Sequence, residues 1–360
     1  MQNYIPTRKI IKNMMMSVLA QIVSLATSFA LGFIVPKFIS EQDYSYWQIY
    51  ILYVSYVGIL HFGLLDGLVL RYSQYDYEDL DKARLRSQFQ FMVSFISAIA
   101  FLCCIYAYIF LRAISAHILV LIALGMVSKN VFTYTSYTFQ ITNRISKYAI
   151  LVIAQRTVYA ITVILMIITG ATEYYWYCIA DLLGDVSGFI IGLSYNREMY
   201  LGKKLALIET LKEAKTNILA GINLMIANFA SSFIMGGAKM IIQWKWDSLV
   251  FGKIAFSFSV TNLFLTFVTA LSVVLFPSLK RTEKDKLPNL YLDIRNVISP
   301  LLFIVLLAYF PMCAILEIWL PKYTPSLKYI GVLMPSLIFS SKVSLLTNNY
   351  LKVSALYSPG

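Results

Sequence analysis

Two aspartates and several basic residues lie inside apolar stretches of the sequence, where charge is rare. Asp181 and Asp185 are four residues apart, so a helix would place both on one face. A charge at mid-bilayer costs about 2.5–3.5 kcal/mol on insertion scales, which makes these residues candidates for function. We predict either a cation- or proton-coupling site at this pair or a structural pair neutralised by Lys129 or Arg156. The sequence leaves both interpretations open.

Basic side chains in the same stretches could bind an anion such as phosphate through charge-assisted hydrogen bonds. The predicted cationic cavity comprises Lys129, Arg156, Lys239 and Lys253. Lys129 lies mid-way along its stretch, which favours a cavity role. Lys239 and Lys253 lie towards the ends of theirs, where snorkelling to the interface is the alternative explanation.

Further polar residues interrupt other apolar stretches. Asp66 is a third candidate for ion coupling, and pairing with Arg71 is its structural alternative. A stripe at helical spacing consists of Ser17, Gln21, Ser24 and Ser28. It indicates either a wet cavity or hydrogen bonds to neighbouring helices.

Other chemistries have no signature in the sequence. A phosphate-cradling glycine loop, a nucleophile elbow and a zinc motif are all missing, and His61 and His117 stand alone. We therefore expect a transporter rather than an enzyme, with no metal and no cofactor. The net charge is +12, but the basic residues fall between apolar runs, which argues against a nucleic-acid partner.

The elements that position these residues are membrane helices. The chain is 59% hydrophobic and 13% charged, about half the charge usual in soluble domains. A spanning helix needs about 20 mostly apolar residues. Such runs predict an all-α polytopic membrane protein with ten spans, at 13–36, 46–70, 88–111, 116–140, 148–170, 174–195, 217–242, 250–277, 296–319 and 326–347.

The basic residues between these spans alternate in number. The N-terminus and every second gap hold nineteen lysines and arginines, and the remaining gaps hold five. The positive-inside rule then places the N-terminus in the cytoplasm.

An internal repeat relates the two halves. Ala26–Gly32 resembles Ala230–Gly236 at an offset of 204 residues, and the same offset pairs Asn13 with Asn217. We predict a six-helix lobe over 1–196, a basic cytoplasmic linker over 197–215 and a second lobe over 216–360. Only four helices fall in the second lobe, so we expect a chain truncated at its C-terminus.

Several segments together resemble the Wzx-type O-antigen flippases, in the polysaccharide-exporter branch of the superfamily that includes the multidrug exporters known as MATE. They are Lys12-Asn13, Phe62–Gly67, Gly221–Lys239, Phe251–Leu265 and the Leu-Phe-Pro-Ser-Leu run at 275–279. The resemblance covers essentially the whole chain through apolar patterns. It implies two lobes in a V around a central cavity, in the bacterial inner membrane.

The resemblance also implies a substrate. Such a protein would flip undecaprenyl-diphosphate-linked oligosaccharide from the cytoplasmic to the periplasmic leaflet, beside membrane lipids and other polysaccharide-assembly proteins. The diphosphate would account for a cationic cavity. The family commonly has arginine at Lys239, and lysine keeps the charge without the bidentate fork.

Three other functions fit parts of the sequence. An organic-cation exporter of the same superfamily should have an acidic, aromatic cavity, which suits Asp181 and Asp185 but not Lys129 and Arg156. A membrane-embedded glycan polymerase should carry a large external loop, and the predicted gaps are short. A membrane scaffold would not need charges at mid-membrane. The flippase is the favoured reading.

Overall fold

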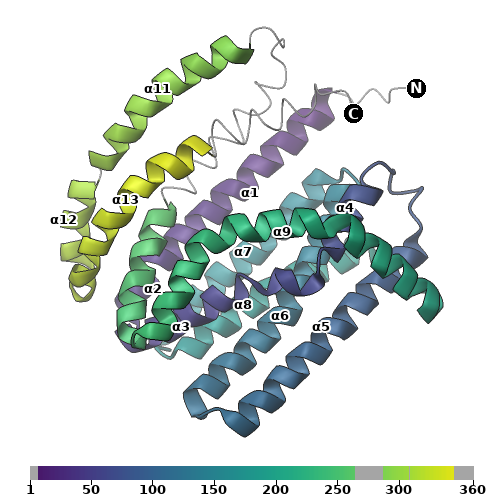
Figure 1. Ribbon diagram of the computed structural model, residues 1–360, viewed down its shortest axis with the longest axis horizontal. Helices are drawn as coiled ribbons and strands as arrows, with labels where there is room; N and C mark the ends of the chain where they lie inside the picture. Colours follow the sequence, from purple (N-terminus) through teal and green to yellow (C-terminus); the bar gives the residue numbers. More distant parts are fainter. Residues whose placement is uncertain (1–6, 264–286, 308, 344–360) are drawn as a thin grey trace. The chain divides into compact units, whose positions relative to one another are not determined.

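The chain folds into helices joined by short connections. The computed structural model describes residues 7–263, 287–307 and 309–343, and these ranges contain no β-strand. The helices in Figure 1 form two compact units. The first unit holds the residues up to Thr27 together with Gln42–Ser248, and the second holds Ser28–Glu41 with the residues from Leu249 onward. The all-α prediction is confirmed.

The first unit contains most of the long helices. They are α1 (Thr7–Phe33, up to Thr27), α3 (Glu41–Val54), the 3₁₀ helix η1 (Val57–His61), α4 (Leu64–Tyr72), α5 (Lys82–Phe110), α6 (Ala113–Ile141), α7 (Ile145–Ile168), α8 (Tyr174–Tyr195), η2 (Arg197–Met199) and α9 (Leu207–Lys245). The strongest packing joins α7 to α8, α4 to α9 and α5 to α6. α9 is the first helix of the predicted second lobe, but in the structure it belongs to the first unit. The predicted division of the chain at 197–215 stays a prediction.

The second unit joins a short N-terminal segment to the C-terminal helices. It holds the end of α1, α2 (Val35–Phe38), the helix Ser248–Leu263 from Leu249 on, α11 (Leu287–Leu307), α12 (Tyr309–Trp319), η4 (Pro321–Ser326) and α13 (Leu327–Lys342). The Trp319 indole Nε1 donates to the Phe33 carbonyl at 3.0 Å. The Lys253 Nζ lies 3.2 Å from a Glu41 carboxylate oxygen.

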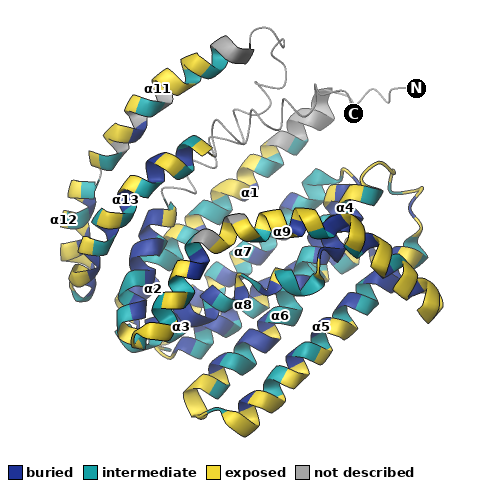
Figure 2. Ribbon diagram, viewed as in Figure 1, coloured by how far each residue is buried: buried dark blue, intermediate teal, exposed yellow. Residues whose placement is uncertain are grey.

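The helices are suited to a bilayer. Among the described residues, six helices are long and apolar enough to cross it, or up to eight if each of two bent pairs is one span. Large apolar side chains also stay exposed, as on α5, where Tyr108 is 91% and Phe110 70% exposed (Figure 2). Such surface is typical of contact with lipid. Of the ten predicted spans, parts of the eighth, ninth and tenth (264–277, 308 and 344–347) lie outside the described residues.

Two of the apolar helices are bent in the first unit. The segment predicted as one span over 46–70 breaks between Glu41–His61 and Leu64–Tyr72, with a 57° bend. At the break Phe62 and Gly63 adopt left-handed φ angles of 49° and 81°. Gly63 tolerates this conformation, whereas Phe62 is an uncommon residue there. α9 bends by 63° between Leu207–Ala230 and Met235–Lys245.

Glycines let α4 lie directly on the first part of α9. A Cβ added at Gly67 would meet the Asn217 carbonyl oxygen at 1.9 Å, and one at Gly221 would meet the Gly63 carbonyl oxygen at 2.1 Å. Both clashes are with backbone, which has no side-chain freedom to give way. Glycine at these positions therefore sets how closely α4 and α9 approach.

Candidate functional site

The structure brings three of the predicted residues into one charge cluster. The Lys129 Nζ on α6 lies 2.8 Å from an Asp181 carboxylate oxygen and 3.0 Å from Asp185, both on α8. Asp181 is 5% exposed and Asp185 fully buried. Because the aspartates are one helical turn apart, one ammonium group reaches both.

Neutral donors complete this cluster. The Tyr50 hydroxyl donates to Asp181 at 3.0 Å, and Ser128 and Gln155 donate to Asp185 at 3.0 and 2.9 Å. Buried carboxylates are tolerated when paired and hydrogen-bonded in this way. The arrangement has the ion pairs of the structural alternative, with Lys129 as the shared partner of both aspartates. One lysine faces two aspartates, so the cluster has one formal negative charge in excess.

A stripe of small residues on α8 positions the cluster. A Cβ at Gly184 would meet the Gln155 carbonyl oxygen on α7 at 2.8 Å, and one at Gly188 would meet the Phe132 ring on α6 at 2.4 Å. Gly192 has a similar close approach to Thr135. The aspartates therefore point between α6 and α7 rather than toward lipid, as their spacing with these glycines predicts.

The other predicted cations are not part of this cluster. Arg156 on α7 forms no ion pair with a carboxylate of the described residues. Lys239 is half-buried in the second part of α9. Lys253 pairs with Glu41 in the second unit. The structure thus does not gather the four predicted substrate-binding cations into one group within the described part of either unit.

The predicted stripe on α1 is only partly covered. Gln21 is exposed, and Ser17, Ser24 and Ser28 are half-buried. Their role in a substrate path or in helix contacts stays a prediction.

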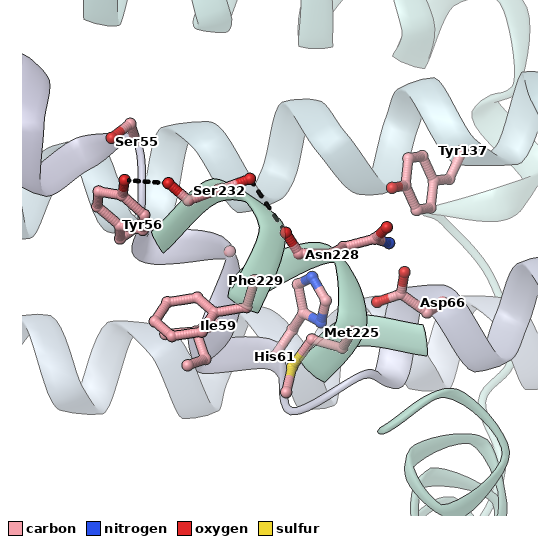
Figure 3. A pocket seen from close by; sticks show the side chains of 11 residues that line it. Ser55, Tyr56, Ile59, His61, Asp66, Tyr137, Met225, Asn228, Phe229 and Ser232 are labelled. Carbon is pink, nitrogen blue, oxygen red and sulfur yellow. Dashed lines mark hydrogen bonds between the residues drawn. The ribbon is translucent and has the colours of Figure 1, made fainter. Parts of the chain in front are cut away.

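A second site lies where the two bent helices of the first unit meet. A cavity of about 170 Å³ is lined by Ser55, Tyr56, Gly58, Ile59, His61, Asp66, Tyr137, Met225, Asn228, Phe229 and Ser232. Asp66, in the first turn of α4, is 6% exposed. In Figure 3 its carboxylate faces the side chains of Asn228 and Tyr137. Irregular backbone at membrane depth is tolerated where it lines such a cavity.

Asp66 does not pair with Arg71, which was the structural alternative. The Arg71 guanidinium instead lies 2.6 Å from a Glu213 carboxylate oxygen and donates to the Asn217 side chain. Glu213 also accepts from the Tyr72 hydroxyl at 2.7 Å. Arg71 is directed to α9, and Asp66 is left facing the cavity.

Several residues of this second site carry no signal in the sequence. His61 seemed isolated, but its Nδ1 accepts from the Gly63 N–H at 3.2 Å at the helix break. Asn228 and Tyr137 come from α9 and α6, far away in the chain. The spacing of Gly63 and Gly67, four residues apart, was the one available sign of a close helix contact here.

Tyr56 ties the two bends together. Its hydroxyl donates to the Ser232 carbonyl oxygen at 3.0 Å, at the bend of α9 (Figure 3). A Cβ at Gly236 would overlap the same phenol. Tyr56 thus supplies a hydrogen bond to a backbone carbonyl at the bend of α9. A residue larger than glycine at position 236 would displace its ring.

We expect Tyr56→Phe to destabilise the protein by about 1 kcal/mol, because one hydrogen bond at the α9 bend is lost. Thermal unfolding of the purified protein would measure this. Tyr195→Phe is the matched control, since no hydrogen bond of the Tyr195 hydroxyl is found among the described residues. Equal melting temperatures for both variants would contradict the role of Tyr56.

Comparison with known proteins gave no match: no protein-family model, curated protein or solved structure matches the chain.

Proposed function

We propose that this chain is a membrane transporter of the oligosaccharide-flippase type. The observation that carries the transport part is the cavity between two bent apolar helices, with a buried carboxylate in its wall. Interrupted membrane helices are typical of transporter binding sites, because the breaks free backbone groups for ligands. A scaffold would have no need of such breaks, and the chain offers no catalytic motif for a glycan polymerase.

The proposed substrate is undecaprenyl-diphosphate-linked oligosaccharide, moved from the cytoplasmic to the periplasmic leaflet and driven by an ion gradient or the membrane potential. The resemblance of the sequence to Wzx-type flippases supports this substrate. It also supports ten spans in two MATE-like lobes, the cytoplasmic N-terminus and the bacterial inner membrane. These finer features are parts of the proposal.

The ion pairs that each cation already forms indicate which of the four is best placed to bind the diphosphate. Lys129 and Lys253 are already ion-paired, so each would have to exchange carboxylate for phosphate. Arg156 forms no such pair within the described residues and can offer its fork to phosphate. We therefore place Arg156 first among the four candidates.

Complementation in a host that lacks its own flippase tests this function. We expect the chain to restore surface polysaccharide and Arg156→Gln to lower it about tenfold or more, since a charged hydrogen bond is lost. Arg112→Gln is the control, because Arg112 is exposed at the start of α6. Immunoblots of the membranes would match expression. No restoration by the parent chain with a matching glycan would overturn the proposed substrate.

Export of organic cations is the second candidate. It is favoured by a groove of about 970 Å³ that shares Tyr56 and Ile59 with the Asp66 cavity. The groove is lined by aromatic, aliphatic and uncharged polar side chains, among them Tyr46, Tyr106 and Trp244, which supply the aromatic part of such a site. Its acidic part would have to come from Asp66 in the adjoining cavity. Drug-sized ligands occupy pockets of about 300–1,000 Å³. Efflux of a cationic dye, without restored polysaccharide, would favour this candidate.

A further inference from the structure

The cavity between the bent helices contains a carboxylate that no neighbouring cation neutralises. Asp66 is 94% buried and lines the cavity, and no lysine or arginine in the described ranges forms an ion pair with it. Arg71, the nearest in sequence, is held by Glu213 and Asn217. A buried charge without a partner is costly, so the carboxylate needs either a proton or a compensating cation.

His61 does not supply that positive charge. It is the titratable imidazole in the same lining, and its Nδ1 accepts a hydrogen bond from the Gly63 N–H. A nitrogen that accepts carries no proton, so the ring is neutral in this arrangement. Tyr137, the other titratable group facing Asp66, is neutral in its ordinary state.

The remaining polar lining consists of oxygen atoms suited to a hard cation. The Asn228 side chain faces the Asp66 carboxylate across the cavity and brings an amide oxygen to the lining. The Ser55 hydroxyl donates to the Leu52 carbonyl at 2.6 Å, which leaves its oxygen lone pairs free to accept. The Tyr137 hydroxyl also faces the cavity. Carboxylate, amide and hydroxyl oxygens are the ligands that hard cations prefer.

Charge and size narrow the class of ion. A single carboxylate balances a single positive charge, and the described residues contain no group of three His, Cys, Asp or Glu that could hold a multivalent metal. A cavity of about 170 Å³ has room for an ion together with several waters. It suits an alkali ion with a few waters and is below the size of a drug-sized organic cation.

We propose that this cavity binds one alkali cation, with Asp66 as the charged ligand and Asn228 as a neutral oxygen ligand. Both bent helices then contribute to the site, Asp66 from α4 and Asn228 from α9. The inference builds on the proposed function, because a cation held between two bent helices would be the coupling ion that transport needs. Binding itself can be measured without any transported substrate.

Equilibrium binding of radioactive Na⁺ to the purified full chain in detergent tests the site. We expect saturable binding of about one Na⁺ per chain, unaffected by an excess of N-methyl-D-glucamine, a cation too large for the cavity. Asp66→Asn should weaken Na⁺ binding at least about tenfold, because the charged ligand is lost. Asn228→Ala should weaken it severalfold. Asp76→Asn, at an exposed loop position, is the matched control and should bind as the parent chain does.

Three outcomes would overturn the proposal. They are no saturable Na⁺ binding by the parent chain at any pH, undiminished binding by folded Asp66→Asn, and equal losses in Asp66→Asn and Asp76→Asn. Elution as a single species and an unchanged helical circular-dichroism signal would show that a variant is folded. If Asp66→Asn did not fold, Asn228→Ala would decide the question, and unchanged binding in that variant would also count against the site. Failure of the complementation assay would leave this result unaffected.

Discussion

Lys129→Met is expected to be the most destabilising single substitution in the first unit, by about 3–5 kcal/mol. The variant would leave Asp181 and Asp185 buried beside each other without their shared ammonium group. Thermal unfolding of the purified protein, together with its level in membranes, would measure the effect. The position of Lys129 in the sequence favoured a cavity role, for which a substitution would lower export at an unchanged protein level.

A double variant separates these two explanations. If the lysine acts by neutralising the aspartates, adding Asp181→Asn to Lys129→Met should recover part of the lost stability, since one uncompensated charge is removed. Asp181→Asn alone should cost less, because Lys129 keeps Asp185 as a partner. A Lys129→Met protein that is as stable as the parent but inactive in export would instead support a contact with substrate.

Gly67→Leu is expected to have the second largest effect, because it forces α4 away from α9. A Cβ at this position would lie 1.9 Å from the Asn217 carbonyl oxygen and 2.6 Å from its carbonyl carbon. Overpacking of this kind costs about 1–3 kcal/mol and sometimes more. Because the Asp66 cavity lies beside this contact, Na⁺ binding should fall together with stability.

Gly221→Val tests the same contact from α9, where an added Cβ would lie 2.1 Å from the Gly63 carbonyl oxygen. Gly32→Ala is the control, since its Cβ would make an ordinary contact of 3.6 Å with Leu263. Unfolding temperatures and Na⁺ binding would be compared for all three variants. A Gly67→Leu protein with parental stability would show that α4 and α9 do not need the close approach.

The sequence predicted the all-helical class because its apolar runs are long. It missed the break within 46–70 because the apolar pattern continues on both sides of Phe62 and Gly63 and the run holds no proline. The left-handed turn there is supported by contacts between α4 and α9, and Gly63 and Gly221 are far apart in the chain. Contacts between residues so far apart in the chain leave no pattern in the local sequence from which the turn could be predicted.

The sequence identified the charged residues of the cluster but not which cation pairs with the two aspartates. The four-residue spacing placed Asp181 and Asp185 on one face, and the glycines of α8 indicated that the face was packed. Whether Lys129 or Arg156 would be the partner depended on the register between α6, α7 and α8. Likewise, Arg71 forms its ion pair with Glu213, 142 residues away, and not with Asp66, which is close to it in the sequence.

The second unit combines an early segment of the chain with late ones, so it cannot fold until most of the chain has been synthesised. The Trp319 indole donates to the carbonyl of Phe33, 286 residues earlier, and Ser28–Glu41 has its packing partners at Leu249 and beyond. At about 5–20 residues per second, a ribosome needs roughly 15–60 seconds to cover that distance. During that time Ser28–Glu41 lacks the residues that it packs against in the folded second unit. We therefore expect this segment to depend on the insertion machinery or a membrane chaperone, and to be the part most readily degraded when synthesis stalls.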